Sequence, residues 1–271
     1  MQHRNADVFG ARKPLRAWLS ATALALFLSA PVSAHKTFLA SGQHMWATGD
    51  TVEVGLTSAL EFPNIESGPR LDRISFTSVS VANAPVEDLT FREGAAALTL
   101  SFQAHESGFS VVAMSTHPRA GEISPENTAA YLDEIEASPA VRQAFEDLPG
   151  SPALNRSYSK HTKTFLCIDT CDVGEEAGEA PLGQALEFVS IGGEERAFAL
   201  LRDGQSVANQ RVTIYSSDGE HAAVTTNQDG VVNVSSDFTG VVLLSAIWVT
   251  APDHPSGNYH SDQATLTTRL D

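Results

Sequence analysis

The chain has 271 residues, of which 42% are hydrophobic, and an excess of Asp and Glu over Lys and Arg gives it a formal net charge of −16 at pH 7. A field of this sign repels the phosphates of nucleic acids and anionic lipids, so it argues against a nucleic-acid partner and against a role at an anionic membrane surface. The same field attracts cations, which is compatible with metal capture.

Residues 1–34 have the pattern of a secretory signal peptide. A basic start that includes Arg12 and Lys13 precedes an apolar run at 17–28, and small residues lead up to Ala34. Cleavage after Ala34 removes four cations and one anion, so the formal charge changes from −16 to −19. The mature chain contains no second apolar run of about 18 residues, so we expect no membrane insertion and a periplasmic location.

His35 would then be the first residue of the exported protein. An N-terminal histidine carries two nitrogen ligands, its α-amino group and its imidazole, which can close a chelate ring on one metal ion. Their ordinary pKa values of about 7.7–8.0 and about 6.5 allow both to be deprotonated near neutral pH. The alternative is that the signal peptidase simply cuts at this position and that His35 has no metal role.

Residues 35–171 are expected to form an N-terminal β-sandwich domain. Apolar and polar residues alternate in short segments, which indicates half-buried antiparallel strands at 51–56, 74–77, 98–102 and 108–112. A further strand at 158–168 places His161 and Lys163 on one face, and Tyr158 and Lys160 on the other.

A helical insertion interrupts this domain at 124–148. Ser124-Pro125 and Ser138-Pro139 each offer a capping serine followed by proline at the first helical position, so the sequence predicts two short helices there.

The two cysteines, Cys167 and Cys171, lie four positions apart. Disulfides persist in exported proteins, but an extended chain holds these Cα atoms about 13 Å apart, so a bridge requires a turn at Asp169 and Thr170. A local disulfide, a thiolate pair for a soft metal and free thiols all remain open.

Residues 172–183 form an acidic, glycine-containing stretch that we interpret as a linker to a second domain at 184–271. Strands are expected at 186–191, 197–201, 211–215, 231–234, 241–249 and 264–270, and Asp-Gly pairs between them are typical of tight turns. The expected fold class is therefore all-β, with two β-sandwich domains, the C-terminal one immunoglobulin- or transthyretin-like, and the helical insertion in the first.

Several short motifs follow one another along the mature chain: Ala34-His35-Lys36-Thr37-Phe38-Leu39, Gly49-Asp50-Thr51-Val52, Phe62-Pro63, Tyr131-Leu132, Tyr158-Ser159-Lys160 and Thr226-Asn227-Gln228-Asp229-Gly230. In this order they resemble the NikM-type family of exported proteins, which is associated with nickel/cobalt transport and has a mature start of the form Ala-His-x-x-x-Leu. The resemblance implies metal handling and an inner-membrane metal transporter as partner. The chain departs from it at Ile247-Trp248-Val249, where many relatives have a histidine.

His35 is the leading candidate ligand, and His117 and His161 are the candidate partners that would complete its coordination. His117 ends a predicted strand and His161 lies within one, so each can face a shared cleft. Imidazole nitrogen suits nickel, copper and zinc, and a nitrogen-rich square-planar or tetragonal site favours nickel(II) or copper(II).

The favoured function is a periplasmic metal-binding protein that captures or delivers nickel, cobalt or possibly copper for uptake, by binding and hand-over rather than turnover. One alternative is a copper enzyme of the polysaccharide monooxygenase type, because those β-sandwich enzymes also use an N-terminal histidine. Another is a structural or ligand-binding sandwich module in which the histidines are incidental.

Overall fold

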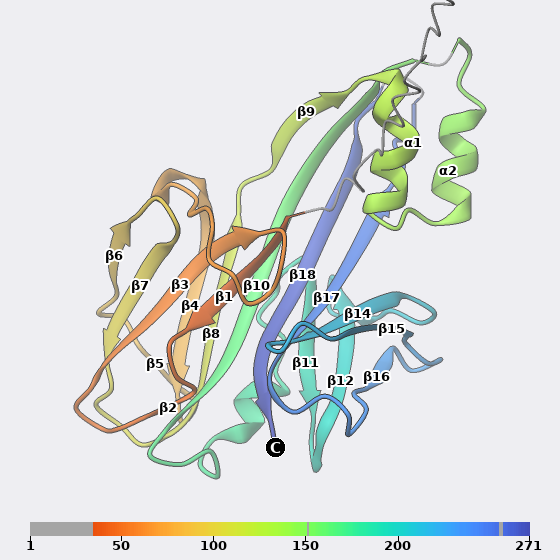
Figure 1. The fold of residues 1–271 in the computed structure, drawn as a ribbon. Helices are drawn as coiled ribbons and strands as arrows, with labels where there is room; N and C mark the ends of the chain where they lie inside the picture. Colours follow the sequence, from red (N-terminus) through yellow and green to blue (C-terminus); the bar gives the residue numbers. More distant parts are fainter. Residues whose placement is uncertain (1–34, 151, 255–256) are drawn as a thin grey trace, which may run out of the picture. The chain divides into compact units, whose positions relative to one another are not determined.

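A computed structural model describes residues 35–150, 152–254 and 257–271 (Figure 1). The predicted signal peptide lies outside these residues. Across the described ranges, no helix combines the length and the hydropathy needed to cross a bilayer. The fold is all-β, with three sheets and two short α-helices in the part of the chain that is described.

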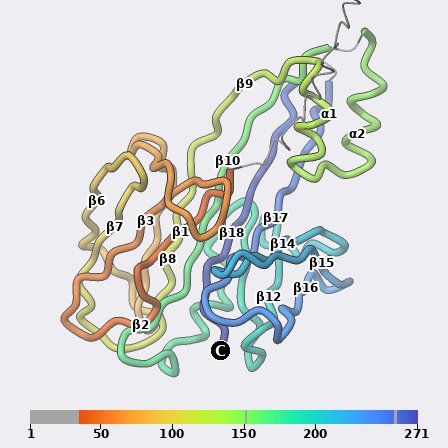
Figure 2. Tube along the Cα trace, viewed as in Figure 1, coloured from red at the N-terminus to blue at the C-terminus, as the bar shows by residue number. Residues whose placement is uncertain are grey.

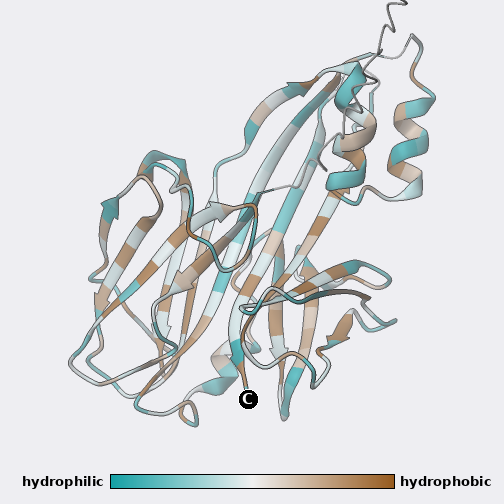
Figure 3. Ribbon diagram, viewed as in Figure 1, coloured by the Kyte–Doolittle hydropathy of each residue, from teal (hydrophilic) through white to brown (hydrophobic). Residues whose placement is uncertain are grey.

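The first sheet is antiparallel and consists, in spatial order, of β1 (Lys36–Ser41), β3 (Thr51–Ala59), β7 (Leu98–Gln103) and β6 (Thr90–Glu93). Alternate residues of β3, namely Val52, Val54 and Leu56, are fully buried, as the period-two pattern predicts. Figure 3 shows the result as brown bands that alternate with paler ones along the strands.

The central sheet runs in the order β15 (His221–Thr225), β14 (Arg211–Ser216), β17 (Gly240–Thr250), β18 (Tyr259–Leu270), β10 (Leu154–Ile168), β8 (Gly108–Thr116), β4 (Ile74–Val81) and β5 (Ala84–Pro85). Two short strands, β2 (Met45–Trp46) and β9 (Arg119–Ile123), also pair with β10. β10 and β18 are parallel and run side by side, with Arg156 opposite Tyr259 and Thr164 opposite Thr267 (Figure 2).

The third sheet contains β11 (Leu186–Ile191), β12 (Glu194–Arg202), β13 (Gln205–Ser206) and β16 (Val231–Asn233). Each outer sheet packs on the central one through its own apolar core. One core joins β3 and β7 to Val112 of β8 and Leu166 of β10, and the other joins β11 and β12 to Val111 and Phe165, the adjacent residues on the same two strands. Because side chains alternate along a strand, the two faces of β8 and β10 therefore serve different sandwiches.

The helical insertion is present as predicted. α1 (Pro125–Glu134) and α2 (Pro139–Glu146) both begin at proline, and the Ser138 hydroxyl accepts a hydrogen bond from the Val141 amide at the start of α2. Leu132 and Val141 pack with Leu154 of β10 and Tyr259 of β18, so the helices cover the ends of the two parallel strands.

The segment predicted as a linker contains a short 3₁₀ helix, η2 (Glu175–Gly178), in which Gly178 is buried. The strands on either side of this segment share the central sheet, because β10 precedes it and β18 follows it. The division into two domains at 172–183 stays a prediction. Cys167 and Cys171 form a disulfide with Cα atoms 4.9 Å apart, and Asp169 between them has the left-handed conformation that the turn requires.

A buried ion pair joins β10 to β11. The Lys163 ammonium donates hydrogen bonds of 2.8 Å to Glu187 Oε2 and to the Phe188 carbonyl, and both charged side chains are at most 1% exposed. The carboxylate also accepts hydrogen bonds from the amides of Leu182 and Gly183. The pair therefore fixes the end of the 172–183 segment against the central sheet.

Replacing Glu187 by alanine is expected to lower the free energy of unfolding by about 3–5 kcal/mol, because it leaves the Lys163 ammonium buried and uncompensated. Chemical denaturation followed by circular dichroism measures the change. Glu53→Ala is the matched control, since Glu53 forms a largely exposed pair with Arg92 at 3.8 Å, and its loss should cost at most about 1 kcal/mol. Equal losses in the two variants would contradict this account of the buried pair.

Candidate functional site

His35 lines a cavity of about 910 Å³ above one face of the β10–β18 pair. The floor consists of Tyr158 and Lys160 from β10 with Ser261 and Gln263 from β18, which are paired in register. Most other lining residues belong to β1, β3, β8, β9, β17 and α1, and further ones come from the segment 67–73. His35 is exposed, so its side chain is accessible from solvent.

The α1 helix presents polar side chains to this cavity. Tyr131 and Glu134 line it, while Leu132 between them packs into the apolar core below the helix. Burial raises the pKa of Glu134, and the positive charges of Lys160, Arg156 and His35 oppose this rise. Glu134 is therefore a carboxylate that shares one electrostatic environment with His35.

Arg156 and Lys160 bring positive charge to the cavity from the same strand. The Arg156 guanidinium lies over the rings of Tyr131 and Tyr158, at 4.9 and 4.8 Å from their centroids. Lys160 Nζ donates a 2.9 Å hydrogen bond to Gln263 Oε1. Burial, with a contribution from Arg156, lowers the pKa of Lys160 to about 8.

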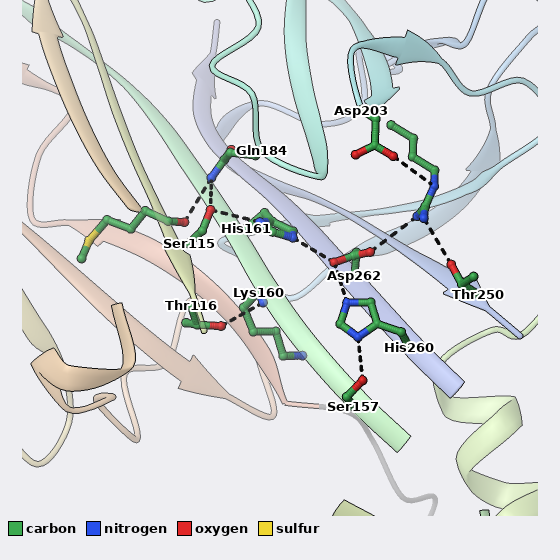
Figure 4. A network of polar contacts seen from close by, with 12 residues as sticks. Ser115, Thr116, Ser157, Lys160, His161, Gln184, Asp203, Thr250, His260 and Asp262 are labelled. Carbon is green, nitrogen blue, oxygen red and sulfur yellow. Dashed lines mark hydrogen bonds and ion pairs between the residues drawn. The ribbon is translucent and has the colours of Figure 1, made fainter. Parts of the chain in front are cut away.

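A second polar cluster lies on the opposite face of the same strands (Figure 4). Asp262 Oδ1 is 3.0 Å from His161 Nε2 and 3.1 Å from His260 Nε2, and Asp262 is only 3% exposed. His260 Nδ1 contacts the Ser157 hydroxyl at 2.7 Å, and His161 Nδ1 contacts that of Ser115 at 3.0 Å. Every ring nitrogen in this cluster therefore has a protein partner.

Electrostatics keep Asp262 ionised. Burial raises its pKa, but the hydrogen bond from His161 and the charge of His260 outweigh burial, so the pKa of Asp262 lies below its usual value. Arg202 Nη1 approaches the second carboxylate oxygen at 3.5 Å. The cluster is therefore a satisfied, charge-balanced network between β10, β18 and β12.

The structure places the three predicted ligand histidines in three different environments. His35 lines the cavity, and His161 belongs to the network on the other face of β10. His117 is exposed just after β8, where its carbonyl accepts a hydrogen bond from Arg73. Among the described residues, no group of three or more His, Cys, Asp or Glu side chains is arranged to hold a metal ion. A metal role for these residues stays a prediction.

Sequence reasoning missed the partners of both clusters. The predicted strand at 264–270 begins earlier, because β18 extends from Tyr259 through its pairing with β10 and β17. His260 and Asp262 are therefore strand residues two positions apart that face the same side. The His-x-Asp spacing was the available signal, but it indicates a shared face only once a strand is assumed.

Comparison with known proteins assigns the chain to a family. The chain is an all-β protein with a polar cavity between its first two sheets and the helical insertion. Residues 32–250 match the family described as "Domain of unknown function (DUF4198)", and the chain belongs to it. No curated protein matches. Among solved structures, the D0-D1 domain of intimin shows 11% identity and a TM-score of 0.21, over 87% of this chain and 98% of that one.

Asp262→Asn is expected to lower the free energy of unfolding by about 1–3 kcal/mol at pH 7, because His161, His260 and Arg202 lose their charged acceptor. A carboxyl whose folded pKa is lowered contributes stability above its ordinary pKa of about 4, and this contribution is lost as the pH falls through the lower folded value. The gap between wild type and variant should therefore narrow below about pH 4.

Urea denaturation at several pH values measures this gap. The control is Asp88→Asn, which changes an exposed carboxylate and should leave stability within about 0.5 kcal/mol of wild type. A gap for Asp262→Asn that stays constant down to pH 2 would show that its charge is not what stabilises the network.

Proposed function

We propose that the protein is an exported metal-binding protein that captures or delivers nickel, cobalt or copper, with His35 as its anchoring ligand. Cleavage after Ala34 would free the α-amino group next to the His35 imidazole, so that both nitrogens bind one ion. The observation that carries the proposal is the position of His35 at a solvent-accessible cavity large enough for an ion and its remaining ligands.

Oxygen donors line the same cavity as this anchor. Glu134 shares the electrostatic environment of His35, and Tyr131, Ser261 and Gln263 line the same cavity. His117 and His161 are not among the residues that line it. We therefore propose that the amine and ring of His35 bind the ion and that oxygen ligands complete its coordination, as nickel(II) and copper(II) allow.

Export and hand-over complete the proposal. The pattern of residues 1–34 supports secretion to the periplasm, and the motifs shared with the NikM-type family support delivery to an inner-membrane metal transporter. The copper monooxygenase alternative receives less support, because that chemistry uses a second histidine and, of the described histidines, only His35 lines the cavity.

The test compares mature protein that begins at His35 with protein carrying one extra glycine ahead of it. The extension moves the amine away from the imidazole, so nickel(II) and copper(II) affinity should fall at least about tenfold, or about 1.4 kcal/mol. Isothermal titration calorimetry measures the affinity, and elemental analysis should find about one ion per chain. Mass spectrometry of the exported protein checks the cleavage site.

Two substitutions serve as a matched pair for this test. His35→Ala should weaken binding at least as much as the extension, whereas His105→Ala, which changes an exposed histidine outside the cavity, should leave it unchanged. Absence of a stoichiometric ion after loading, or an equal loss in both alanine variants, would overturn the proposal.

A further inference from the structure

The cavity has the opposite charge to the protein that contains it. After residue 34 the chain has 13 Lys and Arg residues and 32 Asp and Glu residues. Among the described residues, five of these 13 cations line the cavity, whereas Glu134 is the one acidic residue of the 32 that does so. The five are Arg70, Arg73, Arg119, Arg156 and Lys160. A strongly acidic protein has therefore gathered more than a third of its cations around one cavity.

Four of these five cations form no ion pair with a carboxylate in the described part of the chain, whereas Arg70 pairs with Asp72 at 3.1 Å. Arg73 donates a hydrogen bond to the His117 carbonyl instead. The other three are Arg119, Arg156 and Lys160. The Nε atom of Arg156 is buried without a hydrogen-bond partner. A buried donor of a charged group is costly when it has no partner, so a bound anion would stabilise the Arg156 guanidinium. Glu134 is the one carboxylate among the described lining residues, and it offsets only part of the positive charge of the cavity.

The Arg156 side chain is held in place before any ligand arrives. The rings of Tyr131 and Tyr158 contact its guanidinium, and Lys160 Nζ lies 5.5 Å from the Tyr158 ring. A guanidinium presents a planar set of donors that matches a carboxylate or a phosphate, and a preorganised side chain loses little entropy on binding. The geometry therefore favours recognition of a planar or tetrahedral oxyanion.

We propose that this cavity binds a small organic or inorganic anion that carries carboxylate or phosphate groups, with Arg119, Arg156 and Lys160 as its charged contacts. The volume of about 910 Å³ lies within the range of about 300–1,000 Å³ that small-molecule sites occupy. Ser261, Gln263 and Asn127 add neutral hydrogen-bonding groups to the lining. The acidic net charge disfavours nucleic acid and anionic membranes as the source of the phosphate.

The anion site does not depend on metal binding, but it deepens the proposed function where both hold. An ion held by His35 would be repelled by the cations of the cavity, and a bound carboxylate or phosphate would offset this repulsion and offer oxygen ligands. This step rests on the proposed function. It implies that the metal and the anion increase each other's affinity by the same factor.

The experiment titrates metal-free mature protein with citrate, with inorganic phosphate and with glucose, at constant ionic strength, by isothermal titration calorimetry. The metal is removed with phenanthroline, a neutral chelator, because the usual polycarboxylate chelators would compete for the site. We expect citrate, phosphate or both to bind with one site per chain and a Kd below about 1 mM, and glucose not to bind. Preference for citrate or for phosphate assigns the anion class.

Arg119→Gln and Lys160→Met should each weaken anion binding at least about tenfold. Arg119 is exposed and Lys160→Met removes a partly buried charge, so both variants should fold, which circular dichroism verifies. Arg92→Gln is the matched control: it removes one exposed cation outside the cavity and should change the affinity less than twofold. Absence of binding by both anions, or an equal loss in Arg92→Gln, would overturn the proposal.

Repeating the titration with His35→Ala separates this inference from the proposed function. Anion binding by metal-free protein should survive this substitution, whatever happens to nickel or copper binding. The contrary result is loss of anion binding in His35→Ala together with wild-type affinity in Arg119→Gln and Lys160→Met. It would show that the anion contacts His35 rather than the cations, and would contradict the site proposed here.

Discussion

The parallel pairing of β10 with β18 is the constraint on which both polar clusters depend. Its register places Ser157 opposite His260 and Lys160 opposite Gln263. Because successive side chains point to opposite faces of a sheet, this one pairing builds two separate polar surfaces, the buried network and the floor of the cavity. A shift of one residue would exchange the faces and dismantle both, so the register is as important as the residues.

Among the described residues, charged groups have partners on one face of the β10–β18 pair and form no ion pairs on the other. On the network face, Asp262 has partners for both oxygens, and the nearby Lys163 is matched by Glu187. Buried polar groups that are fully satisfied stabilise one arrangement of the strands. On the cavity face, Arg156 and Lys160 form no ion pair among the described residues, and Glu134 is the one described carboxylate that lines the same cavity. This difference supports a structural role for the Asp262 network and is the basis for the ligand site that we propose at the cavity.

The sequence predicts the elements far better than their pairing. Alternation gave the strand at 158–168 and the correct faces for Lys160 and His161, and the two prolines gave the helix starts, because these signals are local. The partner of His161 lies 101 residues further along the chain, and no local pattern reports such a contact. His35 could be singled out from the cleavage pattern alone, but the cavity beside it could not.

The net charge of the chain gives no sign of the cations that line the cavity. Averaged over the chain, acidic residues dominate, yet Arg119, Arg156 and Lys160 meet where β9, β10 and α1 converge. Salt screens exposed charges beyond about 8–10 Å, so a ligand far from the cavity experiences the acidic exterior, while a ligand inside it experiences the cations. A bare divalent ion is therefore attracted from a distance and repelled at close range. If the proposed metal site holds, an anion bound beside the ion would remove this conflict, and this is the physical reason for expecting the two proposed ligands to favour each other's binding.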